Sequence, residues 1–166
     1  MQAIINSPIT PKRLPKGADV RQVAGLRVTD CNLDEGYINI TPTPWRRLKN
    51  APSERSVPLS PEAVKVLKAI ITGKDPDAPV FERYARPRGM DRVSAMMMKR
   101  FRKVITDKKL SMHSLRHRMK DKLRNTGCPE AVSMAILGHG TNTVAANYGS
   151  GYAIEVMREH MEKAWL

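Results

Sequence analysis

The sequence has few of the features that mark several common classes of protein. Its two cysteines, Cys31 and Cys128, are far apart and form no C-x-x-C pair. This argues against a disulfide framework or a zinc ribbon and favours a reducing compartment. No apolar run approaches the roughly 18 residues that cross a bilayer, and the N-terminus lacks the order of a secretory signal. These absences predict a soluble, cytoplasmic protein that does not span a membrane.

Acidic residues are scarce beside basic ones. The 166 residues include 29 Lys and Arg against 16 Asp and Glu, a formal net charge of +13. Residues 82–124 hold 15 of the basic residues and 4 of the acidic ones. Solvated faces usually mix both signs. A concentrated positive field is instead suited to a polyanion, either nucleic acid or an anionic membrane surface, and it would make binding to phosphates strongly salt-dependent.

The length suits one domain. Residues 1–16 are rich in Pro and Lys and are expected to form an extended arm, so that the domain itself covers 17–166. β-prone runs predict two strands, 37–41 and 55–59, paired as a hairpin, with a turn-like stretch at 29–36. The expected class is mainly α with this small antiparallel sheet (α+β).

Apolar spacing and capping residues predict the helices. They are expected at 18–26, from Ser60 to about Ile71, and at 94–105, 111–125, 129–137, 142–148 and 153–164. In the helix 94–105, Met97, Phe101 and Val104 are expected to point inward. In the last helix, the apolar stripe around Met157 leaves two alternatives open, packing on its own domain or on a neighbouring copy.

Five residues suggest chemistry on a phosphodiester. His113 and Arg116 share one helix face, His139 follows a helix end, Tyr148 comes nine residues later, and Lys49 lies at the hairpin tip. A phenol can attack phosphorus and store the bond as phosphotyrosine, and a guanidinium can grip two phosphate oxygens. Imidazoles can move protons, and the lysine can protonate the leaving hydroxyl. This chemistry needs no metal and no cofactor.

The order and spacing of these residues resemble the tyrosine recombinase (phage integrase) family. The matching motifs are His113-x-x-Arg116, Leu137-Gly138-His139 with Tyr148 nine residues on, and the segment from Arg47 to Leu59. The resemblance runs from about Gly17 to Lys163. It implies the catalytic-domain fold shared with type IB topoisomerases, and DNA cleavage and rejoining through a 3′-phosphotyrosyl link.

The resemblance also implies roles for these residues. Tyr148 would be the nucleophile, Arg116 would stabilise the phosphorane, and Lys49 would be the general acid. His113 and His139 would assist proton transfer and phosphate binding. The partner would be double-stranded DNA and not a membrane, and a tetramer would bind this DNA. The protein would be associated with a bacterial nucleoid or encoded by a phage. The basic residues expected to contact this DNA are Arg46, Arg47, Lys99, Arg100, Arg118 and Lys120.

The chain departs from the family pattern in its first motif. The family arginine of Gly-x-Arg-x-x-Glu is replaced by Asp19, and the glutamate by Gln22. A carboxylate beside a phosphate repels it, and one lost donor costs about 3–4 kcal/mol in such sites. Arg21, Arg27 or the arm residue Arg13 are the candidate substitutes. The alternative function is a cleavage-impaired integrase relic that only binds DNA.

One domain of the family is expected to be missing, and two rival functions lack residues that they need. The family's N-terminal DNA-binding domain is expected to be absent. A helix-turn-helix over 122–137 lacks side chains that read base edges on its second helix. A zinc hydrolase using His113 and His117 lacks the glutamate of H-E-x-x-H, because Ser114 stands there.

Overall fold

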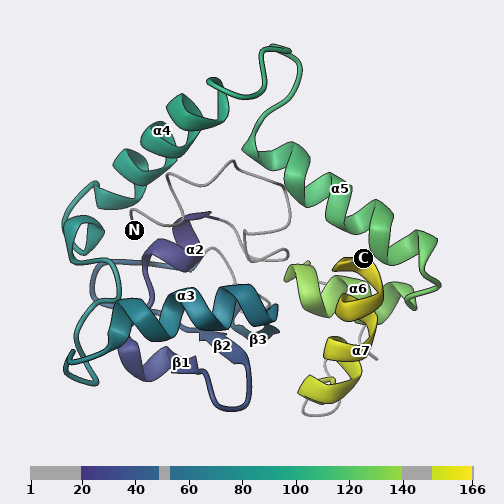
Figure 1. Cartoon of the computed structure of the whole chain (residues 1–166), viewed down its shortest axis with the longest axis horizontal. Coiled ribbons are helices and arrows are strands. Elements are labelled where there is room, and N and C mark those ends of the chain that lie inside the picture. The colour runs from purple at the N-terminus through teal and green to yellow at the C-terminus, as the bar shows by residue number, and fades with distance from the viewer. Residues whose placement is uncertain (1–19, 49–52, 140–150, 166) are drawn as a thin grey trace.

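The computed structural model describes residues 20–48, 53–139 and 151–165. They form a small antiparallel sheet and six α-helices (Figure 1). The helices are α2 (Val20–Ala24), α3 (Pro61–Ile71), α4 (Gly89–Phe101), α5 (Met112–Asn125), α6 (Glu130–Leu137) and α7 (Ile154–Trp165). Short 3₁₀ helices lie at Val28–Asp30 and Glu82–Tyr84. The expected class, mainly α with a small antiparallel sheet, is confirmed.

The sheet has the order β1 (Cys31–Asn32), β2 (Tyr37–Ile40) and β3 (Arg55–Pro58). The predicted hairpin of β2 and β3 is confirmed, with Ile38 opposite Val57 and Ile40 opposite Arg55. The stretch expected to be a turn also contains β1, which pairs with β2. At two residues, β1 is too short to show any alternation in the sequence.

The register of β3 decides which of its side chains face the core. Alternate residues of a strand share a face, so Arg55 lies on the same face as the fully buried Val57. Ile38 and Ile40, directly across the pairing, are also fully buried. The aliphatic stem of Arg55 therefore starts from the core side of the sheet.

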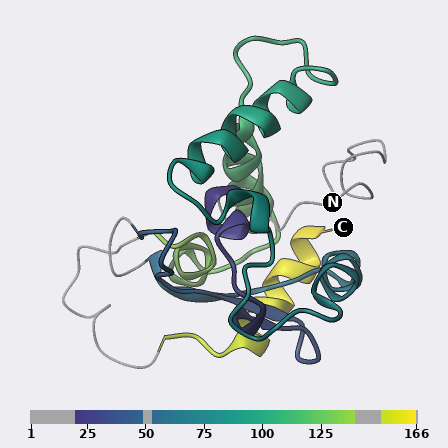
Figure 2. The same ribbon diagram turned by 90° about the vertical axis from the view of Figure 1, so that its left-hand side faces the viewer.

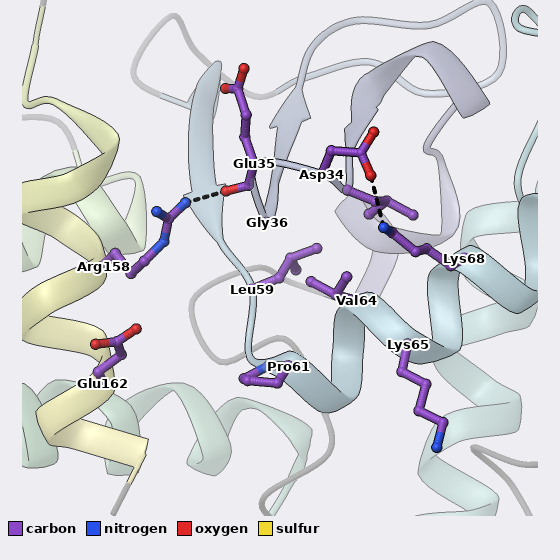
Figure 3. Close-up of a pocket in the computed structure, with 11 residues that line it drawn as sticks. Asp34, Glu35, Gly36, Leu59, Pro61, Val64, Lys65, Lys68, Arg158 and Glu162 are labelled. Carbon is purple, nitrogen blue, oxygen red and sulfur yellow. Dashed lines mark hydrogen bonds and ion pairs between the residues drawn. The ribbon is translucent and has the colours of Figure 1, made fainter.

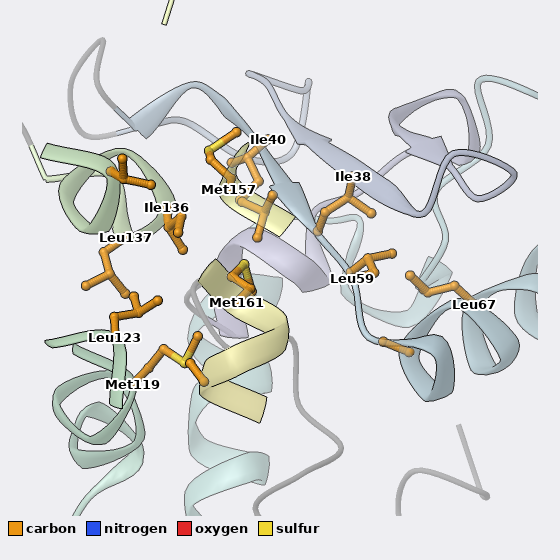
Figure 4. Close-up of a cluster of buried hydrophobic side chains, with 14 of the residues drawn as sticks. Ile38, Ile40, Leu59, Leu67, Met119, Leu123, Ile136, Leu137, Met157 and Met161 are labelled. Atoms are coloured by element: carbon orange, nitrogen blue, oxygen red, sulfur yellow. The ribbon is translucent and has the colours of Figure 1, made fainter. Parts of the chain in front are cut away.

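Helices α5, α6 and α7 complete the main core against β3. Met157 and Met161 of α7 lie between the sheet residues and the side chains of α5 and α6 (Figure 4). Of the two alternatives left open for the last helix, the structure therefore has packing within its own domain. Met119 and Leu123 of α5 are at most 1% exposed.

Helix α4 begins earlier and ends earlier than the predicted 94–105. It starts at Gly89, where a Cβ would lie 2.0 Å from the Tyr84 carbonyl oxygen, so this close approach requires glycine. It ends at Phe101, and the Arg102 guanidinium then donates to the carbonyls of Asp107 and Leu110, both at 2.7 Å. The prediction that Val104 points inward is wrong, because its side chain is 57% exposed.

Helices α4 and α5 rise from the sheet and are joined at their far end (Figures 1 and 2). The caps of α3 and α5 are as predicted. Ser60 Oγ accepts from the Ala63 N–H at 3.3 Å, and Ser111 precedes α5. No described helix has the length and apolarity that a membrane span requires.

Packing of α5 on this core predicts a large effect of truncating Leu123. Leu123→Ala should lower the free energy of unfolding by about 2–5 kcal/mol, because it leaves a cavity in a fully buried site. The matched control is Leu110→Ala, since Leu110 is 41% exposed, with an expected change within about 0.5 kcal/mol. Urea unfolding measures both, and equal losses would contradict the described core.

Candidate active site

Helix α5 presents Arg116 toward the end of α6. The helix starts after Ser111, whose N–H donates to Ser114 Oγ at 3.0 Å, and so fixes the first turn. Arg116 lies on that helix one turn before the buried Met119. Its Nη2 donates to the carbonyl oxygen of Leu137, the last residue of α6.

The end of α6 is shaped by Gly138. This residue has φ +66°, a left-handed conformation that glycine adopts without strain. The next N–H, of His139, donates back to the Met134 carbonyl at 3.0 Å. His139 is thereby held, half-buried, at the C-terminal end of α6, where helix carbonyls carry partial negative charge.

A second arginine, Arg55 of β3, reaches the same helix end. Its Nε donates to the Ile136 carbonyl at 3.1 Å, and its Nη1 to the Ser53 carbonyl at 2.9 Å. Nη2 donates to Gln22 Oε1 at 3.2 Å. Sequence reasoning did not select Arg55. Two features of the sequence could have indicated a role for Arg55 in the site. It lies two residues before the apolar Val57 of a predicted strand, and it is close to the predicted Lys49 segment.

The charges of these groups act on one another. Burial, and then the charge of Arg116, lower the pKa of Arg55 to about 10. The pKa of His139 is also lowered, first by burial and then by the charges of Arg116, Lys120, Arg55 and His113. The neutral imidazole of His139 is therefore favoured, in a region of positive potential that suits an anion.

The predicted site residues fall into two groups. Arg116 donates to the carbonyl of Leu137, two residues before His139, and the charges of Arg116 and His113 both lower the pKa of His139. The His113 ring also meets His117 edge-on, with centroids 4.7 Å apart. The other expected members, Lys49 and Tyr148, lie outside the described residues, as does Asp19.

Two of the three candidate substitutes for the first-motif arginine, Arg21 and Arg27, have contacts in the fold, and Arg13 lies outside the described residues. Arg21 donates to Ser94 Oγ at 2.9 Å and lies 3.7 Å from an Asp91 carboxylate oxygen, which ties α2 to α4. Arg27 pairs with the buried Asp30 at 3.0 Å. Their role as substitutes stays a prediction.

Among the residues expected to touch DNA, Arg46 needs correction. It is 4% exposed and donates to the backbone carbonyls of Gln22 and Thr41. A Cβ on Gly25 would lie 2.5 Å from its side chain, so the backbone closes over it. Its side chain is therefore a buried part of the fold and is not available to a partner.

The remaining expected DNA contacts are accessible to different degrees. Arg47, Lys99 and Arg118 are exposed, and Arg100 and Lys120 are half-buried. Lys120 lies 3.9 Å from Glu130, an exposed pair of small energetic weight. These five residues stay predictions.

A groove of about 550 Å³ lies elsewhere, between the β1–β2 turn, α3 and α7 (Figure 3). Lys68 of α3 contacts Asp34 at 2.8 Å, and Arg158 of α7 donates to the Glu35 carbonyl. These contacts fasten the turn to both helices. No residue that lines the groove belongs to the arginine–histidine cluster at the end of α6.

Comparison with known proteins identifies the family of this chain. The sequence profile of the phage integrase family matches residues 17–152. The chain belongs to the phage integrase family. The mainly helical domain with its small sheet has the fold of a tyrosine recombinase catalytic domain, as the sequence resemblance predicted.

A solved structure with a similar fold is the integrase of the Tn1549 transposon, in complex with a circular intermediate DNA. The match has a TM-score of 0.56 at 18% identity and covers 97% of the present chain. It covers 61% of the transposon integrase, so the present chain spans about three fifths of that structure. Comparison with curated protein sequences gives no match.

The contact of Arg55 with Gly138 predicts unequal effects of two glycine substitutions. A Cβ on Gly138 would lie 2.5 Å from Arg55 Nη1, whereas nothing lies within 4 Å of one on Gly127. Gly127→Ala should cost about 1–2 kcal/mol through its left-handed backbone, and Gly138→Ala distinctly more. Urea unfolding measures the difference, and equal costs would contradict the placement of Arg55.

The shifted pKa of His139 predicts a charge dependence. Lys120→Gln should raise this pKa toward the ordinary value, because it removes a repelling charge, whereas Lys122→Gln should leave it unchanged. Histidine NMR titration measures both variants, and an equal response would contradict the cluster. The pKa of His139 is lower in the folded than in the unfolded state. Its contribution to stability is therefore fully present above the unfolded pKa of about 6.5, and it is lost as the pH falls from there through the folded pKa.

Proposed function

We propose that residues 17–166 form the catalytic domain of an integrase that cleaves and rejoins double-stranded DNA. The observation that carries the proposal is the convergence of Arg116, His139 and Arg55 at the C-terminal end of α6, in a chain whose family match covers residues 17–152. Positive groups held near one another in a partly desolvated place suit a phosphodiester.

In the proposed reaction, Tyr148 attacks the phosphorus of a DNA phosphodiester. The phenol passes its proton to an imidazole of the site, that of His139 or His113, as a bond forms from its oxygen to phosphorus. The bond from phosphorus to the 5′ oxygen breaks. The 5′ oxygen takes a proton from Lys49 and leaves as a hydroxyl. The product is a 3′-phosphotyrosyl link, which the 5′-hydroxyl of an exchanged strand reverses.

Arg116 contributes by holding the non-bridging oxygens while negative charge builds up on them. A neutral His139, favoured by the surrounding cations, can accept a proton or donate a hydrogen bond to phosphate. His113, on the same face of α5 as Arg116, would share these tasks.

The basic surface would hold the duplex. Residues 82–124, which contain α4 and α5, carry 15 Lys and Arg. The structurally similar Tn1549 integrase was solved with DNA, and this supports DNA as the partner. Assembly of four copies on DNA belongs to the same proposal.

A nicked duplex traps the proposed intermediate, because the released short strand diffuses away. Since the target sequence is unknown, the substrate is a pool of nicked duplexes with random sequence. We expect a covalent protein–DNA adduct that survives denaturation and that mass spectrometry assigns to Tyr148. Tyr148→Phe should abolish the adduct, since it lacks the nucleophilic oxygen.

Two outcomes would contradict the proposal. The first is an adduct equally abundant with Tyr148→Phe. The second is no adduct at any protein concentration, which favours the DNA-binding relic. If the wild-type chain forms no adduct but Asp19→Arg does, the carboxylate of Asp19 in the first motif is the cause of the lost cleavage.

A further inference from the structure

We propose that Arg55 is a second phosphate-binding arginine of this site, which acts beside Arg116 on the same DNA phosphate. The inference rests on the proposed function. It supplies a guanidinium in a chain whose first motif has Asp19 where the family has arginine. Five observations on described residues support it.

The first two observations are its position and its confinement. Arg55 leaves the sheet on the core face, beside Val57 and opposite Ile40, and its head reaches the helix end from which His139 follows. At that point, Gly138 has no side chain, and a Cβ there would lie between 2.5 and 2.9 Å from three atoms of the guanidinium group. The missing Cβ therefore makes room for this group.

The third observation is how the guanidinium is held. Its described hydrogen bonds go to the Ile136 and Ser53 carbonyls and to Gln22 Oε1, at 3.1, 2.9 and 3.2 Å. These oxygens are neutral, and the bonds fix the orientation of the group. A planar group fixed in this way loses little entropy when it binds a phosphate.

The fourth observation is the repulsion between the two arginines. The charge of Arg116 lowers the pKa of Arg55, so the two guanidiniums are close enough to repel each other. Both donate to the last carbonyls of the same helix, those of Ile136 and Leu137. An anion between two cations that repel each other is attracted to both, and a phosphodiester has two non-bridging oxygens to offer them.

The fifth observation is the residue that contacts Arg55 from α2. Gln22 stands where the family motif has glutamate. A glutamate there would pair with Arg55 as an ion pair and compete with phosphate. The neutral amide of Gln22 accepts the same hydrogen bond without adding a carboxylate charge, so Gln22→Glu is an isosteric test of this role.

The competing role is purely structural, with Arg55 capping the end of α6. NMR on the wild-type 166-residue chain separates the two roles. Inorganic phosphate is the probe, and the Nε–H resonances of arginines are the readout. We expect those of Arg55 and Arg116 to shift together along one binding curve, and that of Arg158, which donates to the Glu35 carbonyl, to stay fixed. A shift of Arg116 without Arg55 would overturn the inference.

Variants extend the test to the reaction. In the nicked-duplex assay, Arg55→Gln should lower the rate of adduct formation by about 10²–10³, the range for loss of one such donor. Arg55→Lys should recover part of the rate, because it keeps the charge but not the fork. Gln22→Glu should lower the rate and weaken the phosphate-induced shifts while thermal stability is maintained. Lys65→Gln, at an exposed lysine outside residues 82–124, should change neither the rate nor the shifts. A folded Arg55→Gln that reacts at the wild-type rate would overturn the inference.

The failure of this inference can be told apart from failure of the proposed function. Phosphate binding needs no nucleophile, so Tyr148→Phe should keep both arginine shifts. Shifts of Arg55 and Arg116 without any adduct would support the phosphate site and contradict cleavage. An adduct from a chain whose Arg55 ignores phosphate would support cleavage and contradict the role of Arg55.

Discussion

The site depends on the hydrogen bonds that Arg55 and Arg116 donate to the C-terminal end of α6. A helix end leaves carbonyls without partners in the helix, and here those of Ile136 and Leu137 accept from Arg55 and Arg116. Each bond brings in a different element, β3 and α5. The same helix end places His139 through the left-handed Gly138. One local feature thereby assembles side chains from three parts of the chain.

Core packing fixes the directions of those elements. Arg116 precedes Met119 by one turn, and Met119 and Leu123 are buried against the sheet and α7. Arg55 precedes Val57 by two residues on a strand paired with β2. The charged groups are therefore placed by neighbouring apolar residues. Burial and mutual repulsion make the charged forms of these groups less favourable, and the pKa values of Arg55 and His139 are lowered for this reason.

Local signals predicted much of this structure. Ser60 and Ser111 marked helix starts, and the two longer strands followed from their β-prone residues. The order and spacing of His113, Arg116 and His139 match the family motifs, and their roles stay predictions. Where a feature depended on distant residues, prediction was incomplete or wrong. The start of α4 depends on the approach of Gly89 to Tyr84, and the burial of Arg46 depends on Gly25. Arg55 was missed because its partner Ile136 lies 81 residues away.

The central claim is that a DNA phosphate binds at the end of α6, and a crystal structure with a nicked duplex tests it most directly. The account predicts a phosphodiester whose non-bridging oxygens accept hydrogen bonds from both Arg116 and Arg55, with His139 beside it. A duplex bound over another surface, with no phosphate within hydrogen-bond distance of either arginine, would contradict it.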